Sequence, residues 1–324
     1  MSTHTSPRKS PRKSPAAPSP LAVPGAKAEV LHYSAFTTDP AGGNPAGVVL
    51  DAEALDDDQM LAVAAQVGYS ETAFVTALPD SRPGSSGTGP HPAARRYRLR
   101  YFSPLAEVAF CGHATIATAV ALASRTGTGD LLFDTPVGEI KVGTTADGGP
   151  VRATLTSVPA HSRPAEDMHV EPVLRALRWS RDALDADLPP HIAFAGNDHL
   201  VLAVRSRAQL AALDYDFDAL HDVMRQYGWT TVHLVNRAAP DRFDFHARDP
   251  FPVGGVVEDP ATGAAAAAFG GYLRTLGLVT EPVRVHIRQG EDMGRPSDLY
   301  VDLRPDDARV RVTGQAVPIT APGE

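Results

Sequence analysis

Two short segments place ionisable side chains where helices are expected to begin. Residues 259–264, DPATGA, lead into an alanine-rich run, and residues 111–115, CGHAT, lead into the apolar run 116–123. The first N–H groups of a helix lack intrahelical acceptors and lie at the positive end of the helix dipole, and a glycine there lets an anion approach closely. Each segment therefore predicts a binding site for a carboxylate or phosphate, with Asp259 or His113 beside it.

The two segments lie at matched distances from a proline. Pro104 precedes His113 by nine residues and Pro250 precedes Asp259 by nine, each across an apolar stretch. This spacing predicts an internal duplication, in which two similar halves face each other and both helix N-termini meet in one cleft. Such a cleft favours an enzyme site that holds a small anion between two ionisable side chains. The alternative is that both are ordinary helix starts, with His113 and Asp259 in capping roles.

Glu71 is the third candidate. It lies in the segment 70–74, SETAF, which follows the amphipathic stretch 57–67 and opens an apolar strand. A lone glutamate is usually a solvated surface charge. Removal of a proton from carbon near a carboxylate requires a base held against that carbon, stabilisation of the resulting charge, and exclusion of water. Glu71 can be that base if burial beside Tyr69 and Phe74 raises its pKa.

The order of several motifs resembles the PhzF-like family of phenazine biosynthesis proteins. The resemblance runs from about residue 30 to residue 319 and rests on six segments: GGNPAGVV at 42–49, SETAF at 70–74, RYFSP at 100–104, CGHAT at 111–115, EDPATG at 258–263 and QGEDMGRPS at 289–297. It implies an α+β fold like that of diaminopimelate epimerase. Two pseudo-symmetric lobes, each a curved antiparallel sheet around a central helix, would then enclose the active site between them.

The resemblance also implies the site residues. In the family, a glutamate at the position of Glu71 moves a proton between carbons of a small cyclic diene carboxylate without metal or organic cofactor, and the other catalytic positions correspond to His113 and Asp259. The expected substrate-binding residues are Asn44, Ser70, Gly112, Thr262, Gly263 and Ala264. The family often has serine where this chain has Ala264, and loss of one neutral hydrogen bond, worth about 1 kcal/mol, is expected to retune substrate choice.

The single cysteine, Cys111, separates this chain from related enzymes. Cofactor-free racemases of the same fold use two thiols, so one cysteine excludes a two-thiol racemase. We expect Cys111 to be a small buried filler; the alternative is a nucleophile whose pKa is lowered by the helix N-terminus. Metal binding is not expected, because the twelve histidines are scattered singly and one cysteine cannot build a structural cluster.

The elements that must position these residues follow from patterning. Helices are predicted at 57–67 and 217–227, a solvent-exposed insertion at 81–93 and a linker at 159–164. The expected strands lie at 30–36, 46–50, 97–102, within 131–142, and at 151–155, 191–195, 199–204, 231–236, 244–247, 283–288, 299–303 and 310–313.

Length and charge complete the prediction. A chain of 324 residues with 43% apolar content suits two domains. We expect a disordered basic tail at 1–27, an N-terminal lobe at 28–158 to which 309–320 returns, and a C-terminal lobe at 159–308. The tail carries five basic and no acidic residues, so the total of −8 leaves about −13 on the remainder, and a nucleic-acid partner is not expected.

The sequence as a whole favours an isomerase. One cysteine and the lack of a long apolar run predict a cytoplasmic protein without a membrane span, and the resemblance suggests a homodimer. We expect cofactor-independent proton transfer on a small-molecule carboxylate, with Glu71 as acid and base, in secondary-metabolite biosynthesis. The alternatives are a catalytically silent binding protein of the same fold, and a hydrolase or lyase that uses Cys111 or Glu71.

Overall fold

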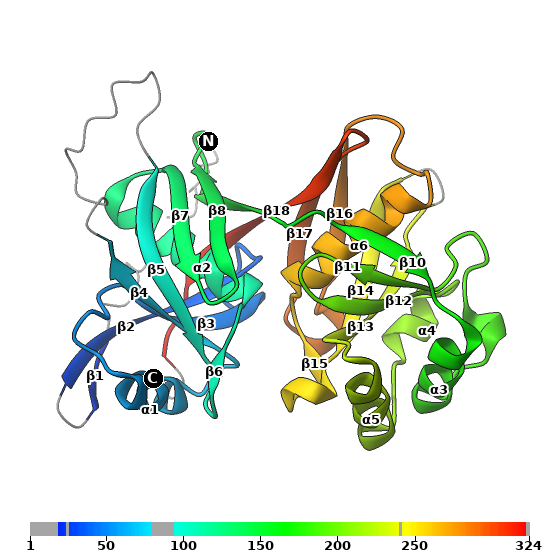
Figure 1. Cartoon of the computed structure of the whole chain (residues 1–324), viewed down its shortest axis with the longest axis horizontal. Helices are drawn as coiled ribbons and strands as arrows, with labels where there is room; N and C mark the ends of the chain where they lie inside the picture. The colour runs from blue at the N-terminus through cyan, green and yellow to red at the C-terminus, as the bar shows by residue number, and fades with distance from the viewer. Residues whose placement is uncertain (1–18, 24–25, 79–93, 240–241, 322–324) are drawn as a thin grey trace, which may run out of the picture.

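Two lobes lie side by side in the computed structural model, which describes residues 19–23, 26–78, 94–239 and 242–321 (Figure 1). Each lobe is a strongly curved sheet around one buried helix, α2 (Gly112–Thr126) in the first lobe and α6 (Gly263–Thr275) in the second. Both helices are rich in alanine, and small side chains let the strands wrap closely around them. The predicted α+β fold of two similar lobes with central helices is confirmed.

The first lobe has a mixed sheet. Its strands are β1 (Ser19–Val23), β2 (Ala26–Ala35), β3 (Asn44–Val49), β4 (Thr72–Ala77), β5 (Arg95–Phe102), β6 (Glu107–Val108), β7 (Gly129–Thr135), β8 (Gly138–Thr145) and β9 (Arg152–Thr156). Helix α1 (Asp57–Val67) connects β3 to β4, and α2 connects β6 to β7. β3 pairs parallel with β4, and β5 with β7, because a helical crossover returns the chain in its original direction. The other pairs of this lobe are antiparallel.

The second lobe repeats this topology. Its elements are β10 (His161–Pro164), α3 (Asp167–Leu177), β11 (His191–Phe194), β12 (Asp198–Ala203), α4 (Arg207–Ala211), α5 (Phe217–Tyr227), β13 (Thr231–Arg237), β14 (Asp244–Pro250), β15 (Glu258–Asp259), β16 (Val283–Gln289), β17 (Ser297–Arg304) and β18 (Asp307–Pro318). β12 pairs parallel with β13 across α4 and α5, and β14 with β16 across β15 and α6. The duplication inferred from the proline spacing is therefore present in the strand order.

β18 belongs to both lobes. It pairs with β17 of the second lobe, and with β9 and β2 of the first (Figure 1). These pairings join the ends of the first sheet through β18, so that the sheet closes around α2. The expected lobe boundaries at 158/159 and 309 stay predictions.

Two expectations about connecting segments were wrong in part. Ser19–Val23, inside the tail expected to be disordered, forms β1 and pairs with the first half of β2. Four of the six residues of the expected linker 159–164 form β10, which pairs with β11. In both places the backbone hydrogen bonds of an added strand offset the entropy lost on ordering. Residues 1–18 of the tail and the insertion predicted at 81–93 lie outside the described residues.

The outer helices cover the sheets and were predicted unevenly. α1 and α5 match their predicted bounds, because each has an aspartate N-cap and a left-handed glycine C-cap, which are local signals. α3 and α4 were not predicted. Pro172 lies inside α3, where proline normally argues against a helix, and packing of Val173 and Leu177 in the core compensates.

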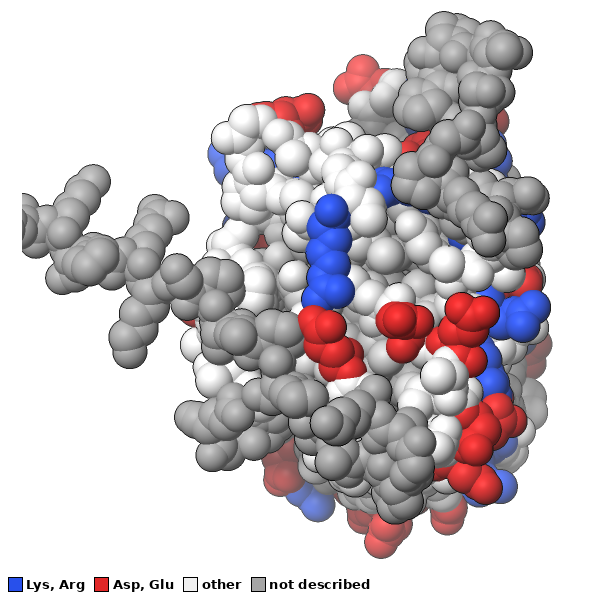
Figure 2. Space-filling view, turned by 90° about the vertical axis from the view of Figure 1, so that its left-hand side faces the viewer, with Lys and Arg blue, Asp and Glu red and all other residues white. Residues whose placement is uncertain are grey.

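The outer face of the first lobe carries both positive and negative side chains among the described residues in view. Figure 2 shows acidic and basic side chains interspersed among neutral ones on this face. Arg100, for example, pairs with Asp57 at 2.6 Å and with Glu107 at 2.7 Å. Of the helices described, none is long and apolar enough to cross a membrane.

Candidate active site

The N-termini of the two central helices meet between the lobes. Cys111 is the N-cap of α2 and Thr262 that of α6, and in the described structure neither side chain caps its own helix. A methyl group placed on Gly112 would lie 3.7 Å from the Cα of Gly263 and 3.8 Å from the amide nitrogen of Ala264. The first turns of both helices are therefore in contact, and their positive dipole ends face a common region.

Asn44 links the two lobes at this point. It begins β3 and is buried, with its Nδ2 3.0 Å from His113 Nδ1. The same Nδ2 donates to Asp259 Oδ1 at 2.7 Å and to the carbonyl oxygen of Ala261 at 3.2 Å. Asp259 Oδ2 accepts a further hydrogen bond of 2.6 Å from Thr262 Oγ1. One amide of the first lobe therefore contacts both the histidine of α2 and the aspartate of the second lobe.

Glu71 lies on the other edge of the His113 ring. Its Oε2 is 3.3 Å from His113 Nε2, and Ser70 Oγ is 3.4 Å from the same nitrogen. Cys111 Sγ lies 3.4 Å from Glu71 Oε2 and 3.4 Å from His113 Nδ1. The structure thus brings Glu71, His113 and Asp259 into one connected cluster, together with the predicted binding residues Asn44, Ser70 and Thr262.

Burial shifts the pKa values of the ionisable groups in this cluster. It raises the pKa of Glu71, with hydrogen bonds from Ser70 and Cys111 opposing the rise. It raises the pKa of Asp259 to about 6, against the opposing effects of His113 and the Thr262 hydroxyl. Burial also lowers the pKa of His113, so this imidazole is neutral near pH 7.

Cys111 is a poor nucleophile in this setting. Burial, and after it the negative charge of Glu71, raises the pKa of its thiol, so the alternative of an activated thiolate was wrong. The side chain is buried, as predicted, yet it contacts two catalytic candidates rather than only filling space.

Sequence reasoning gave no role to Gln289 and Arg295, although both lie in a segment that carries the resemblance. Gln289 Oε1 accepts from the backbone N–H of Thr262 at 3.0 Å, and its Nε2 donates to the carbonyl of Asp259 at 2.7 Å. Arg295 donates to the carbonyls of residues 42 and 43 at 2.8 and 2.7 Å, immediately before the bridging asparagine. The segment 289–297 therefore holds the site loops of both lobes.

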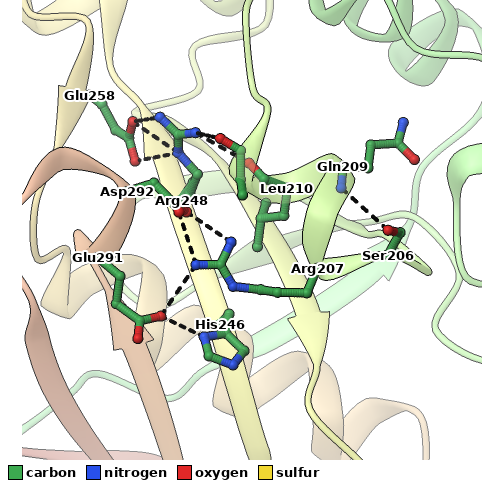
Figure 3. Close-up of polar contacts among 10 residues, drawn as sticks. Ser206, Arg207, Gln209, Leu210, His246, Arg248, Glu258, Glu291 and Asp292 are labelled. Carbon is green, nitrogen blue, oxygen red and sulfur yellow. Dashed lines mark hydrogen bonds and ion pairs between the residues drawn. The ribbon is translucent and has the colours of Figure 1, made fainter.

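An ion pair that the sequence analysis did not predict holds β15 in place. Figure 3 shows Arg248 of β14 against Glu258, the residue before Asp259. Arg248 Nε donates to the two carboxylate oxygens of Glu258 at 3.0 and 3.1 Å, and its Nη1 donates to the carbonyl of Leu210 at the end of α4. No local motif predicts this pairing, because the ion pair depends on strand register.

A cavity of about 700 Å³ opens beside the helix N-termini. The predicted binding residues Gly112, Gly263 and Ala264 line it. Its walls are largely apolar and come from both lobes, including Phe36, Phe110, Ile140, Leu155 and Phe194. None of the described residues that line the cavity is Glu71, Cys111, His113 or Asp259. The cavity therefore lies beside the cluster of ionisable side chains, and the two adjoin at the helix N-termini, where Gly112 and Gly263 line the cavity.

Nearly all of the chain from Tyr33 onward matches one family. Residues 33–321 match the phenazine biosynthesis-like proteins. The chain belongs to that family. Among curated relatives, the uncharacterized isomerase YddE of Escherichia coli K12 is 29% identical, over 90% of this chain and 96% of the relative. The trans-2,3-dihydro-3-hydroxyanthranilate isomerase of Pseudomonas chlororaphis is 32% identical, over 88% and 96%. This phenazine biosynthesis-like protein is accordingly an isomerase.

Solved structures agree with the fold of this phenazine biosynthesis-like protein. A PhzF family protein of Bacillus anthracis has a TM-score of 0.76 and 25% identity, covering 90% of this chain and 96% of that one. A hydroxyproline epimerase of Agrobacterium vitis has a TM-score of 0.58 at 14% identity, covering 89% and 90%. The second likeness concerns the fold alone. The resemblance inferred from the sequence motifs is confirmed.

Proposed function

We propose that the protein is a cofactor-independent isomerase that moves a proton between two carbons of a small carboxylate substrate, with Glu71 as both base and acid. The observation that carries this is the placement of Glu71 in the inter-lobe cluster, 3.3 Å from His113 Nε2 and with its side chain only 15% exposed. Because burial raises its pKa, the carboxylate binds a proton more readily than an exposed glutamate does.

The charge that develops on the substrate needs a fixed counterpart. In this proposal the substrate carboxylate binds the N–H groups of Gly112, Gly263 and Ala264, at the joined ends of α2 and α6. Negative charge delocalised into that carboxylate after proton removal is then stabilised by two helix N-termini without reorganisation of solvent. Ala264 presents an amide and a methyl group but no hydroxyl, which favours an apolar substituent nearby.

The remaining groups orient the proton carrier. His113 is neutral near pH 7, so it contacts Glu71 as a polar neighbour, with 3.3 Å between Nε2 and Oε2, rather than through a full positive charge. Asn44, which donates to Asp259, contacts the opposite edge of the imidazole and fixes the ring. Glu71, protonated after the first step, returns the proton to the second carbon. We place this reaction in secondary-metabolite biosynthesis, in a cytoplasmic homodimer, in line with the name of the Pseudomonas relative and with the single cysteine.

The proposed proton transfer is tested by measuring deuterium exchange at the substrate's carbon atoms. Purified protein is incubated in D₂O with a panel of cyclic diene and cyclic amino carboxylates, and exchange at carbon is followed by NMR. We expect the wild type to incorporate deuterium, Glu71→Gln to lose at least about 100-fold in rate, and the exposed control Glu53→Gln to retain it. Binding of a carboxylate without exchange by the wild type would overturn the proposal in favour of a silent binding protein.

A further inference from the structure

The cavity beside the helix N-termini extends beyond the proposed reacting centre. The amides proposed to hold the substrate carboxylate line it, whereas Glu71 and His113 do not. Its wall continues to Val137 in the turn between β7 and β8, and to Asn197 in the turn between β11 and β12. A substrate whose carboxylate lies at the helix N-termini and whose reacting carbon faces Glu71 therefore leaves cavity space for a further part of the molecule.

The cavity is larger than a small ring requires. Its volume is about 700 Å³. A single-ring carboxylate has about ten non-hydrogen atoms, and at about 30 Å³ for each, the share of one water molecule in the liquid, it fills less than half of that volume. Pockets of about 300–1,000 Å³ are typical of sites that enclose drug-sized ligands. The size therefore fits a substrate with a second ring or a chain of similar bulk.

The walls favour an apolar group in the remaining space. Phe110 and Phe194 line the cavity from the two lobes. Val137 and Val158 also line it, and they are 58% and 49% exposed, although most large apolar side chains of the described structure are buried. An apolar group that covers these two side chains removes their surface from water, which favours binding.

The charges around the cavity limit the substrate to one anionic group. Among the described residues that line it, Glu139 alone is ionisable, and its carboxylate pairs with Arg96 at 2.9 Å. The helix N-termini can bind one carboxylate. A second carboxylate in the cavity would find no lining cation and would be repelled by Glu139. The cavity therefore suits an uncharged group.

The second lobe has neutral residues where the first lobe has ionisable ones. Thr230 precedes β13, which pairs parallel with β12, just as Glu71 precedes β4, which pairs parallel with β3. Ala264 is the second residue of α6, as His113 is of α2. Both Thr230 and Ala264 line the cavity. At these corresponding positions the second lobe offers a binding surface and no second proton carrier.

We infer that the substrate is a monocarboxylate with an uncharged apolar group at least as large as one further ring, and that this group occupies the cavity between the lobes. The position of the carboxylate rests on the proposed function. The size of the cavity, its apolar walls and its single ionisable lining residue are independent of that function.

Binding is tested by calorimetry on the full chain with three probe carboxylates: benzoate, biphenyl-4-carboxylate and biphenyl-4,4′-dicarboxylate. Burial of one further ring should make biphenyl-4-carboxylate bind at least about 10-fold more tightly than benzoate. It should also exceed the dicarboxylate by at least about 10-fold, because the second charge of the dicarboxylate would be desolvated without a partner. Equal affinity for benzoate and biphenyl-4-carboxylate, or a preference for the dicarboxylate, overturns the inference.

The orientation of the ligand is tested with the methyl ester of biphenyl-4-carboxylate. The ester keeps the two rings but lacks the negative charge that the helix N-termini attract, so it should bind at least about 10-fold more weakly than the acid. Equal binding of ester and acid would show that the carboxylate does not lie at the helix N-termini, and would overturn the inference.

Two substitutions fill the cavity from different segments. Ala195→Trp and Val158→Trp each place a large ring among the lining residues and should remove the preference for biphenyl-4-carboxylate while leaving benzoate binding unchanged. Retained benzoate binding also shows that each variant is folded. The control Ala219→Trp lies on the exposed face of α5 and should keep the preference. A preference that survives both cavity substitutions overturns the inference.

Exchange in D₂O separates this inference from the proposed function. Of two cyclic diene carboxylates that the wild type exchanges, the one with a phenyl substituent should have a kcat/KM at least about 10-fold higher than its unsubstituted parent. If no carboxylate exchanges but the binding preference and its loss in Ala195→Trp persist, the proposed function fails and the inference about the cavity stands. If exchange depends on Glu71 but the phenyl group confers no preference in binding or rate, the inference is overturned and the proposed function stands.

Discussion

The buried Asp259 is expected to make the protein less stable as pH rises. Its pKa is raised from 3.8 to about 6, chiefly because burial penalises the charged form. At 1.36 kcal/mol per pKa unit, this rise amounts to about 3 kcal/mol. Between pH 4 and pH 6 folded Asp259 holds a proton that the unfolded chain has already released. The free energy of unfolding therefore falls across this window, and Asp259 makes no such contribution below pH 4.

Asp259→Asn removes that titration and nearly keeps the shape of the site. The amide oxygen can still accept from Asn44, but the amide nitrogen cannot accept from Thr262, a loss of about 1 kcal/mol at every pH. The variant should therefore be about 1 kcal/mol less stable than the wild type at pH 3.5 and about 2 kcal/mol more stable at pH 7.5. Stabilisation by loss of a site residue is expected where function retains an unfavourable buried charge.

Urea unfolding of both proteins from pH 3.5 to pH 7.5 measures this difference. His113 acts with the opposite sign, because its folded pKa is lowered and stability rises with pH up to about 6.5. Its contribution is shared by both proteins and largely cancels in the difference. The exposed control Asp51→Asn should give a difference that is flat with pH. A flat difference for Asp259→Asn as well would refute the claim that burial raises the pKa of this carboxyl group.

Two further predictions concern the segment that holds the site loops. Gly290 has φ +75° and an added methyl would lie 2.3 and 2.8 Å from backbone carbonyl oxygens, whereas Gly68 has φ +70° and open space. Gly290→Ala should cost more than about 3 kcal/mol and Gly68→Ala about 1 kcal/mol in urea unfolding; equal losses would contradict the steric argument. Gln289→Leu leaves the Thr262 N–H without its acceptor and should lower the free energy of unfolding by about 3 kcal/mol. The exposed control Gln66→Leu should lower it by less than about 0.5 kcal/mol. A loss for Gln289→Leu near that of the control would show that the hydrogen bonds of Gln289 add little to stability.

Local patterns predicted the chemistry-bearing elements well. The helix starts at residues 112 and 263 could be predicted from the glycine at the first position of each helix and the apolar run that follows, and α1 from its N-cap aspartate. Strand positions followed from short apolar runs bounded by turn residues. α3 was not predicted because proline inside a segment normally argues against a helix, and Pro172 lies inside α3. β1 was not predicted because its stability comes from pairing with β2 and not from its own sequence. Local preference decides an element only where tertiary contacts do not outweigh it.

The sequence by itself determined two helix N-termini at matched spacing and the ionisable residues beside them, because capping and periodicity act between near neighbours. Only the tertiary structure decided that Asn44 reaches Asp259 across 215 positions, that Cys111 and Glu71 both contact His113, and that the segment 289–297 contacts the site loops of both lobes. Those contacts depend on how the curved sheets close and on strand register. A shift of one residue in the pairing of β3 or β15 would turn Asn44 or Asp259 to the opposite face of its sheet.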